Sequence, residues 1–175
     1  QIRSEFSEVW RAYDEGKVKI HAEIIEDQAD DIYEVCESFF RNTQLAAICA
    51  KQIENMVEEP YYAMRYVNIA RAMHRFIDAD IQSMLYLGMA LPQKSNPKMD
   101  EDLLQRIFEI TIKDSQALGE SKEEGLTNTS YLVFLRGKNF DDEKQQLLDR
   151  LAAGEKIFIM SSYQTLGAGQ NLQYK

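Results

Sequence analysis

The candidate site of this chain is a cluster of hydroxyl residues and glycines that follows its last apolar run. These residues are Ser161, Ser162, Thr165, Gly167 and Gly169. Hydroxyls donate hydrogen bonds to phosphate oxygens, and glycines permit positive φ and close approach of the backbone to a ligand. Neutral donors of this kind position a nucleic-acid backbone without reading its bases. The segment therefore predicts a phosphate-contacting turn rather than a helix.

Two short apolar runs and the segment between them predict the unit that positions this turn. Residues 131–135 and 156–160 are continuous apolar runs of strand length, and residues 141–153 carry leucines on one helical face. Strand, helix and strand joined by short loops make a βαβ unit, with parallel strands and a right-handed crossover. Open α/β sheets bind ligands at the carboxyl ends of such strands, where the hydroxyls and glycines are expected.

The region before residue 119 has apolar residues at helical spacing. Amphipathic stripes predict helices over residues 2–13, 32–40, 45–56 and 100–110. A longer helix is predicted from Pro60 to Pro92, with a kink near residues 78–80. Asn42 and Asp100 stand where N-caps are expected.

These patterns predict a mainly α protein with a C-terminal α/β portion, that is, a helical bundle-like region followed by a βαβ piece of a parallel sheet. The polar, glycine-containing residues 119–128 predict the boundary between them. We therefore expect a helical accessory or insertion region over residues 1–120 and a second unit over residues 129–175. The chain opens at Gln1 and stops at Lys175, which leads us to expect a piece of a longer protein.

Residues 131–174 resemble the second RecA-like lobe of superfamily 2 helicases and translocases, and within that superfamily the Swi/Snf-like members. In that family a strand and a glycine, here Leu135-Arg136-Gly137, precede a helix and a second strand. The helix pattern of the family is matched by Glu143, Lys144, Leu148 and Gly154. Helicase motif V, Ser/Thr-x-x-x-x-Gly-x-Gly-x-Asn-Leu, is matched by Ser162, Gly167, Gly169, Asn171 and Leu172.

The resemblance implies a fragment of an ATP-dependent nucleic-acid helicase or translocase, with residues 129–175 as part of its second motor lobe. It implies that the motif V turn couples nucleotide state to strand contact. Nucleic-acid contact falls on Ser161, Ser162 and Thr165. The positions that face the nucleotide are Gly167, Gly169, Gln170 and Asn171.

The resemblance also implies cofactors and partners for the parent protein. ATP and Mg are expected there, but none is expected to be bound by this chain alone, because it contains no phosphate loop, no metal-binding acidic box and no arginine-rich motif. We therefore expect no catalytic residue in the chain. Nucleic acid, with DNA favoured over RNA, is the expected partner of the parent, and a protein partner of the helical region stays open.

The negative net charge of the chain is compatible with two alternatives to the helicase hypothesis. The net charge is −9, and residues 1–59 alone carry −8, so the chain by itself is expected to bind nucleic acid weakly or not at all. One alternative is a non-enzymatic, acidic helical interaction module whose βαβ unit is merely structural. The other is a different nucleotide-binding α/β protein whose phosphate loop lies outside this chain.

The cysteines and the hydropathy bear on location. Cys36 and Cys49 lie in apolar helical patterns and are expected to be buried, reduced thiols, which favours a cytoplasmic location. No apolar run reaches the ~18–20 residues that cross a bilayer, so no membrane partner is expected.

Three further clusters have a functional and a structural interpretation. The acidic residues around His21 favour a solvated helix face over a metal site, because neither histidine follows a Glu three residues earlier. Around His74, the charged residues Arg71, Arg75 and Asp78 favour an exposed face with i,i+4 pairing over phosphate contact. For Tyr61, Tyr62 and Tyr66, a half-buried helix edge is favoured over a surface that stacks on bases.

Overall fold

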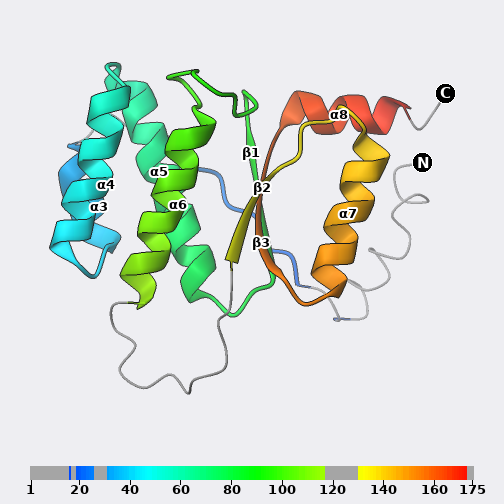
Figure 1. Cartoon of the computed structure of the whole chain (residues 1–175), viewed down its shortest axis with the longest axis horizontal. Coiled ribbons are helices and arrows are strands. Elements are labelled where there is room, and N and C mark those ends of the chain that lie inside the picture. The colour runs from blue at the N-terminus through cyan, green and yellow to red at the C-terminus, as the bar shows by residue number, and fades with distance from the viewer. Residues whose placement is uncertain (1–15, 17–18, 26–30, 117–129, 173–175) are drawn as a thin grey trace.

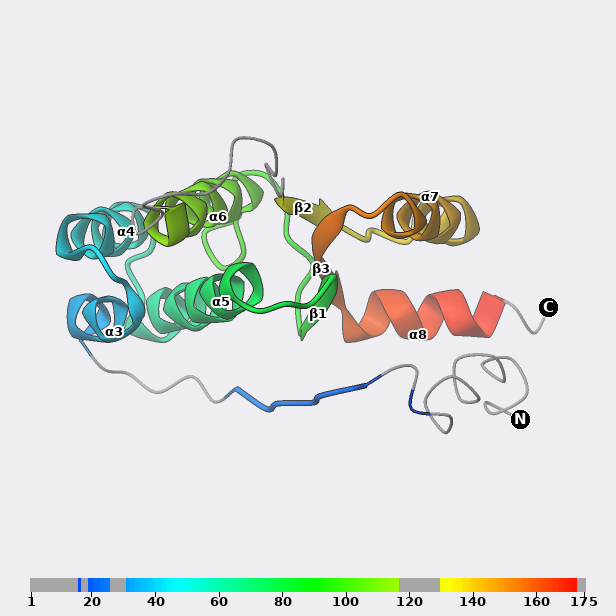
Figure 2. The same cartoon turned by 90° about the horizontal axis from the view of Figure 1, so that it is seen from below.

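The computed structural model describes residue 16 and residues 19–25, 31–116 and 130–172, and in it helices lie on both sides of a small parallel sheet (Figure 1). One layer contains α3 (Ile32–Phe39), α4 (Thr43–Met56), α5 (Pro60–Asp78) and α6 (Glu101–Gln116). On the opposite side lie α7 (Phe140–Ala152) and α8 (Tyr163–Leu172) (Figure 2). The predicted mainly α class with a parallel sheet is therefore confirmed, whereas the RecA-like identity of the sheet stays a prediction.

Within the described part of the chain, the sheet has three strands, in the order β1, β3, β2. They are β1 (Ser83–Gly88), β2 (Ser130–Phe134) and β3 (Lys156–Ser162). Both outer strands pair in parallel with β3, and Ile159 at the centre of β3 has Leu85 of β1 and Val133 of β2 as its partners in register. The predicted parallel pairing of the two C-terminal strands is thus confirmed.

The central strand is buried on both faces, which explains why its sequence is a continuous apolar run. Phe158 is 0 % exposed and packs against the rings of Phe76 and Phe108 in the four-helix layer, at centroid distances of 5.6 and 6.3 Å. Ile157 and Ile159 face the other way, into the smaller core under α7 and α8. Period-two alternation thus divides the side chains of β3 between two cores.

Local capping signals fix where the helices begin. The Asn42 side chain accepts hydrogen bonds from the N–H groups of Gln44 and Leu45, at 2.8 and 3.1 Å, and so caps α4. In the same way, Asp100 Oδ1 accepts from Leu103 N at 2.8 Å at the start of α6. Pro60 is the first residue of α5. These three predicted helix starts are confirmed.

The predicted helix from Pro60 to Pro92 is wrong beyond residue 78. Helix α5 ends at Asp78, at the point where a kink was expected, and residues 83–88 form β1. Two contacts with β3 hold the connection between them, because Lys156 Nζ donates to Ala79 O and Ile157 N donates to Gln82 O, at 2.5 and 2.9 Å. Backbone pairing with β3 therefore overrides the helical spacing of the apolar residues in this stretch.

The predicted glycine turn after β3 is also wrong. Residues 163–172 form the continuous helix α8, which begins directly at the end of the strand. Gly167 lies within this helix, its φ is not in the left-handed region, and a Cβ added there would meet nothing within 4 Å. The backbone at Gly167 therefore does not require a glycine.

The predicted division at residues 119–128 lies outside the described residues, as does the predicted helix over residues 2–13. Strand β1 comes from the region that was expected to be helical throughout, yet it pairs with β3 from the C-terminal region. The region before residue 117 therefore contributes β1 to the same sheet that contains the two strands of the βαβ unit. The assignment of residues 1–120 and 129–175 to separate functional units stays a prediction.

Candidate functional site

A pocket of about 520 Å³ lies at the carboxyl ends of the three strands. The loop after β1 contributes Met89 to Leu91, Gln93 and Asn96; the loop after β2 contributes Arg136 and Gly137; and the end of β3 with the first turn of α8 contributes Ser162, Gln164 and Thr165. In Figure 1 these loops and the start of α8 lie at the upper end of the sheet. The pocket is thus built from three segments that are far apart in the sequence.

The pocket lies where the connections of two neighbouring strands diverge. The chain leaves β1 towards α6 in the four-helix layer, whereas it leaves β3 directly into α8 on the opposite side of the sheet (Figure 2). Strands β1 and β3 are adjacent and parallel. Such a divergence leaves a crevice outside the carboxyl ends of the strands, which is where open α/β sheets bind ligands.

Two of the predicted hydroxyls form a pair in the lining of this pocket. Ser162 Oγ lies 2.7 Å from Thr165 Oγ1 and accepts a hydrogen bond from Thr165 N at 3.1 Å. Ser162 is therefore the N-cap of α8, and both hydroxyls lie at the helix end that carries partial positive charge. One of the two hydroxyl hydrogens is used in this mutual hydrogen bond, and the other is left to donate to an anion that enters the pocket.

The other predicted site residues lie elsewhere. Ser161 is 1 % exposed, and its hydroxyl donates to Leu135 O of the neighbouring segment at 2.9 Å, so it ties β3 to the end of β2. Gly167 lies in the second turn of α8. Gly169, Gln170 and Asn171 belong to the same helix, but their side chains lie outside the described part of the chain.

The loop after β2 is fixed against α8 by a close approach that requires a glycine. Gly137 has φ +77°, and a Cβ added there would lie 2.8 Å from Thr165 Cγ2. The Glu143 carboxylate accepts hydrogen bonds from the N–H groups of Gly137 and Arg136, at 2.7 and 3.3 Å. The glycine and the glutamate that carry part of the family resemblance thus hold the pocket wall in place.

Arg136 is a pocket residue whose role the sequence analysis missed. Its guanidinium donates to Pro92 O at 3.1 Å and pairs with Glu101 Oε2 at 2.5 Å, so it joins the loop after β2 to the loop after β1. The side chain keeps 30 % exposure. The available signal was an arginine placed two residues after an apolar strand, at the same sheet edge as Ser162.

The loop over residues 89–100 forms an ordered wall of the pocket. Gln93 pairs with residues 99 and 101 through backbone hydrogen bonds of 3.0 and 3.1 Å. The Tyr66 hydroxyl donates to Pro97 O at 3.0 Å and accepts from Asp100 N. Burial raises the pKa of Tyr66 to about 12, so its hydroxyl remains protonated and this anchor persists at neutral pH.

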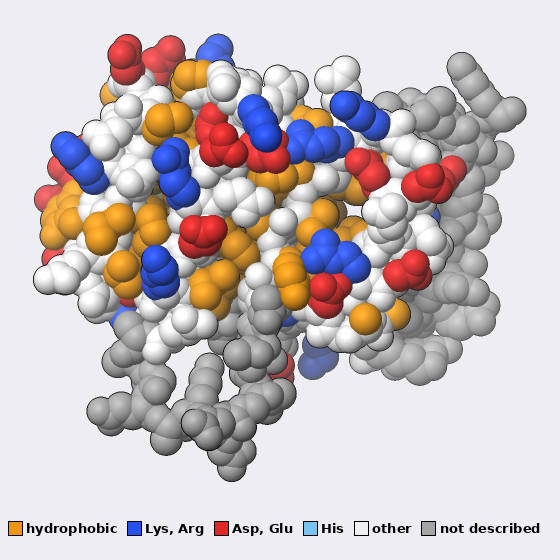
Figure 3. Space-filling view, in the orientation of Figure 1, with side chains coloured by type: hydrophobic (Ala, Val, Ile, Leu, Met, Phe, Trp, Pro, Cys, Tyr) orange, Lys and Arg blue, Asp and Glu red, His pale blue; other side chains and the backbone are white. Residues whose placement is uncertain are grey.

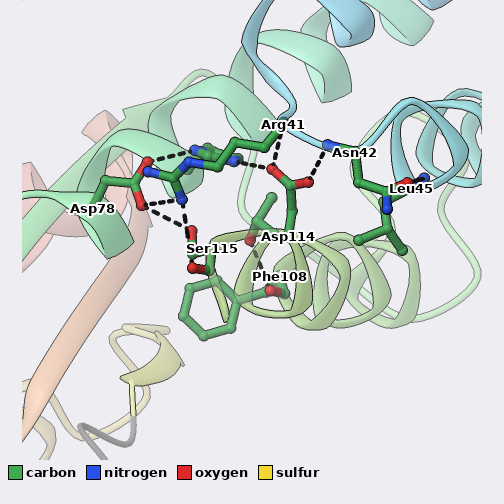
Figure 4. A network of polar contacts seen from close by, with 9 residues as sticks. Arg41, Asn42, Leu45, Asp78, Phe108, Asp114 and Ser115 are labelled. Atoms are coloured by element: carbon green, nitrogen blue, oxygen red, sulfur yellow. Dashed lines mark hydrogen bonds and ion pairs between the residues drawn. The ribbon is translucent and has the colours of Figure 1, made fainter. Parts of the chain in front are cut away.

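A second polar cluster lies at the other end of the helical layer, where α5 and α6 finish (Figure 4). Asp114 is 0 % exposed and accepts hydrogen bonds from the N–H groups of Arg41 and Asn42, at 2.9 and 2.8 Å. Its Oδ2 also lies 2.5 Å from His74 Nε2. Burial alone would raise the pKa of Asp114, but the hydrogen bonds from Arg41, His74 and Asn42 outweigh it and lower that pKa.

His74 links this cluster to the end of α5. Its Nδ1 lies 3.0 Å from Asp78 Oδ2, and Asp78 Oδ1 receives hydrogen bonds from Arg41 Nη1 and Ser115 Oγ, at 3.1 and 2.9 Å. The expectation that His74 belongs to an exposed face is wrong, because the residue is 5 % exposed. The polar side chains of this cluster hydrogen-bond to one another, and these bonds connect α5, α6 and the start of α4.

The described residues contain neither a candidate metal site nor a candidate membrane span. Among them, no group of three or more His, Cys, Asp or Glu side chains is placed to hold a metal ion. Within the same residues, no helix combines the length and the apolar character that crossing a bilayer requires.

Known proteins add no identification. No protein-family model matches the chain, and no curated protein sequence matches it either. The candidate site therefore depends on the geometry of the pocket and on the chemistry of the residues that line it.

Proposed function

We propose that this chain is part of an ATP-dependent nucleic-acid helicase or translocase and that its pocket holds a backbone phosphate of the bound strand. The observation that carries the proposal is the hydroxyl pair of Ser162 and Thr165 in the lining of a pocket at the carboxyl ends of parallel strands. Ligands of open α/β sheets bind at this position. The resemblance of residues 131–174 to the second motor lobe supplies the class of ligand.

The donors around the pocket suit a phosphodiester. The first turn of a helix directs backbone N–H groups towards an anion, and here it does so beside the hydroxyls of Ser162 and Thr165. Arg136 adds a cation to the lining of the pocket, and Glu101 already neutralises part of its charge. Phosphate contacts fix the position of a strand without reading its sequence, as an enzyme that moves along any sequence requires.

The helical conformation of residues 163–172 removes the glycine turn on which the helicase hypothesis relied, so the motif V part of the resemblance no longer supports the proposal and the contact must be made differently. The residue types alone predict phosphate contact by a turn in which Gly167 and Gly169 expose the backbone. In the proposal the same contact falls to the N-terminus of α8, with Ser162 as its cap. Gly137, whose missing side chain admits Thr165, takes over the role of the glycine that permits close approach.

In the parent protein, ATP and Mg would bind between this lobe and another, and closure of the lobes would move the strand contacts relative to each other. Gly167, Gly169, Gln170 and Asn171 are the residues that the resemblance directs towards that nucleotide. Helix α8 would then connect the two sites, since its first turn faces the strand and its later turns face the nucleotide. DNA is favoured over RNA as the strand.

An NMR titration of the ¹⁵N-labelled chain with oligothymidylate at low salt tests the proposal. We expect the amide signals of Gln164 and Thr165 to shift, in fast exchange because binding by the isolated chain is weak. Thr165→Val should remove this response. The matched control is Thr43→Val, which makes the same change at the exposed first turn of α4. If the pocket signals do not shift at oligonucleotide concentrations up to millimolar, the proposal is contradicted and the interaction-module alternative is favoured.

A further inference from the structure

An aromatic and cationic cluster lies at the start of α5 and is not part of the pocket. The rings of Tyr61 and Tyr62 meet edge to face with centroids 5.4 Å apart. The Arg65 guanidinium lies 5.1 Å from one ring and 5.3 Å from the other, and Lys98 Nζ lies 5.2 Å from the Tyr62 ring. Arg65 also donates to the Tyr61 hydroxyl at 3.0 Å. We call these four residues the tyrosine cluster.

The tyrosine cluster lies on the same side of the molecule as the pocket, and the loop over residues 89–100 joins the two. Asn96 of this loop lines the pocket, whereas Lys98, two residues later, lies over Tyr62. Pro97 between them is fixed by the Tyr66 hydroxyl of α5. In Figure 1 the start of α5, this loop and the start of α8 all lie along the upper edge of the molecule.

The cluster holds an aromatic face in a defined orientation without burying it. Tyr61 is 49 % exposed, although its hydroxyl and its ring are both held by Arg65. Tyr66, one turn further along, is 0 % exposed and belongs to the core. An ordered, exposed ring loses little conformational entropy when a flat ligand stacks on it, so Tyr61 is prepared for such a contact.

The segment that contains the cluster has a net charge opposite in sign to that of the whole chain. Residues 60–98 carry a net charge of +3, whereas the chain carries −9. On the face of the molecule that Figure 3 shows, Lys and Arg side chains are interleaved with Asp and Glu side chains, without a continuous patch of either sign. The exposed Glu58 and Glu59 precede the cluster. Arg65 and Lys98 therefore attract a phosphate only at short range. Stacking on Tyr61 must supply most of the free energy of binding at this surface.

We propose that the tyrosine cluster is a second contact surface for single-stranded nucleic acid, in which a base stacks on Tyr61 and the adjacent phosphates lie near Arg65 and Lys98. Combining aromatic rings with a basic track is how proteins bind single strands without sequence preference. The strand would pass from the pocket across the loop over residues 89–100 to α5. This inference rests on the proposed function, because the pocket determines which strand reaches the cluster.

Ring signals of ¹³C-labelled tyrosines in the intact chain test the inference. An oligothymidylate of about eight nucleotides is long enough to reach beyond one contact point. We expect the Tyr61 ring signals to move upfield as the oligonucleotide is added. An abasic oligonucleotide of equal length and charge should leave them in place, because only a base can stack. Tyr33 on α3, which is 39 % exposed, is the internal control and should not respond.

Two variants separate stacking from the other properties of the side chain. Tyr61→Phe keeps the ring and removes the hydroxyl bonded to Arg65, so it should retain the affinity for the oligonucleotide. Tyr61→Leu keeps apolar bulk without a π face and should weaken binding by about fivefold or more, the size of one lost base–aromatic stack. Because Tyr61 is half exposed, neither change should unfold the chain, and the amide spectrum checks this directly.

Each pattern of response decides between the two proposals. Shifts at both Tyr61 and Thr165 support both. Shifts at Thr165 with an unmoved Tyr61 ring overturn the inference and leave the proposed function standing. Shifts at Tyr61 with unmoved pocket signals support the cluster as a stacking surface and contradict the phosphate role of the pocket. Equal shifts with the abasic strand, or none with either strand, overturn the stacking surface, and a protein partner is then the remaining occupant of this edge.

Discussion

Substituting Gly137 with alanine should destabilise the chain through a specific clash with α8. The new Cβ would lie 2.8 Å from Thr165 Cγ2, and the residue would keep φ +77°. A left-handed conformation costs a non-glycine residue ~1–2 kcal/mol. Overpacking adds ~1–3 kcal/mol. We expect a total loss of about 2–5 kcal/mol in the free energy of unfolding, measured by urea denaturation.

Gly154→Ala is the matched control for this experiment. Gly154 also has a left-handed φ, +88°, but a Cβ added there would meet nothing within 4 Å. It should therefore lose only the backbone part, ~1–2 kcal/mol. Combining Gly137→Ala with Thr165→Ser, which removes the clashing methyl, should recover most of the difference between the two alanine variants. Equal losses for both alanine variants, or no recovery in the double variant, would refute the packing of the pocket wall against α8.

Three further predictions follow from the same structure. Gly167→Ala should raise stability by ~0.5–1 kcal/mol, because alanine favours the interior of a helix, whereas a loss in urea denaturation would indicate the turn first expected from the sequence. The stabilising contribution of Asp114, whose pKa is lowered from 3.8, is present at pH values above 3.8 and is lost as the pH falls through the lower pKa of the folded state. The urea midpoint of the unmodified chain should therefore fall more steeply over that acidic range than that of Asp114→Asn, and parallel curves would be inconsistent with the lowered pKa. Cys49 should resist thiol reagents in the folded chain, because its hydrogen bond with Cys36 and its burial raise its pKa; fast labelling without denaturant would contradict this.

The sequence predicts those parts of the fold that depend on local chemistry. Asn42, Pro60 and Asp100 mark helix starts because caps and first-turn prolines act within a few residues. The strand over Lys156–Ser162 is recognisable because burial on both faces leaves no polar position along most of its length. These features need no knowledge of the tertiary structure.

The errors arise where contacts between distant residues decide the structure. The stretch that forms β1 has apolar residues at spacings that also suit a helix, and only its pairing with β3, more than seventy residues later, makes it a strand. Residues 163–172 contain two glycines that favour a turn, yet they continue from β3 as a helix capped by Ser162. Neither outcome can be derived from local propensity.

The candidate site was predictable in part. Ser162 and Thr165 were identified from their residue types and their place after a buried strand, and the structure brings them into one pocket. Arg136 and the loop over residues 89–96 were not identified as partners, because the carboxyl end of β1 was hidden inside the predicted long helix. A site shared by three strands becomes visible only when all three are recognised.

Photo-cross-linking tests most directly whether the pocket at the carboxyl ends of the strands receives nucleic acid. The chain is irradiated with an oligonucleotide that carries 4-thiothymidine, and the attached peptides are mapped by mass spectrometry. We predict attachment at peptides that contain residues 89–96 and 162–165, and its loss from the second of these in the Thr165→Val variant. Attachment confined to α3 and α4, or equal attachment with and without Thr165, would contradict the proposal.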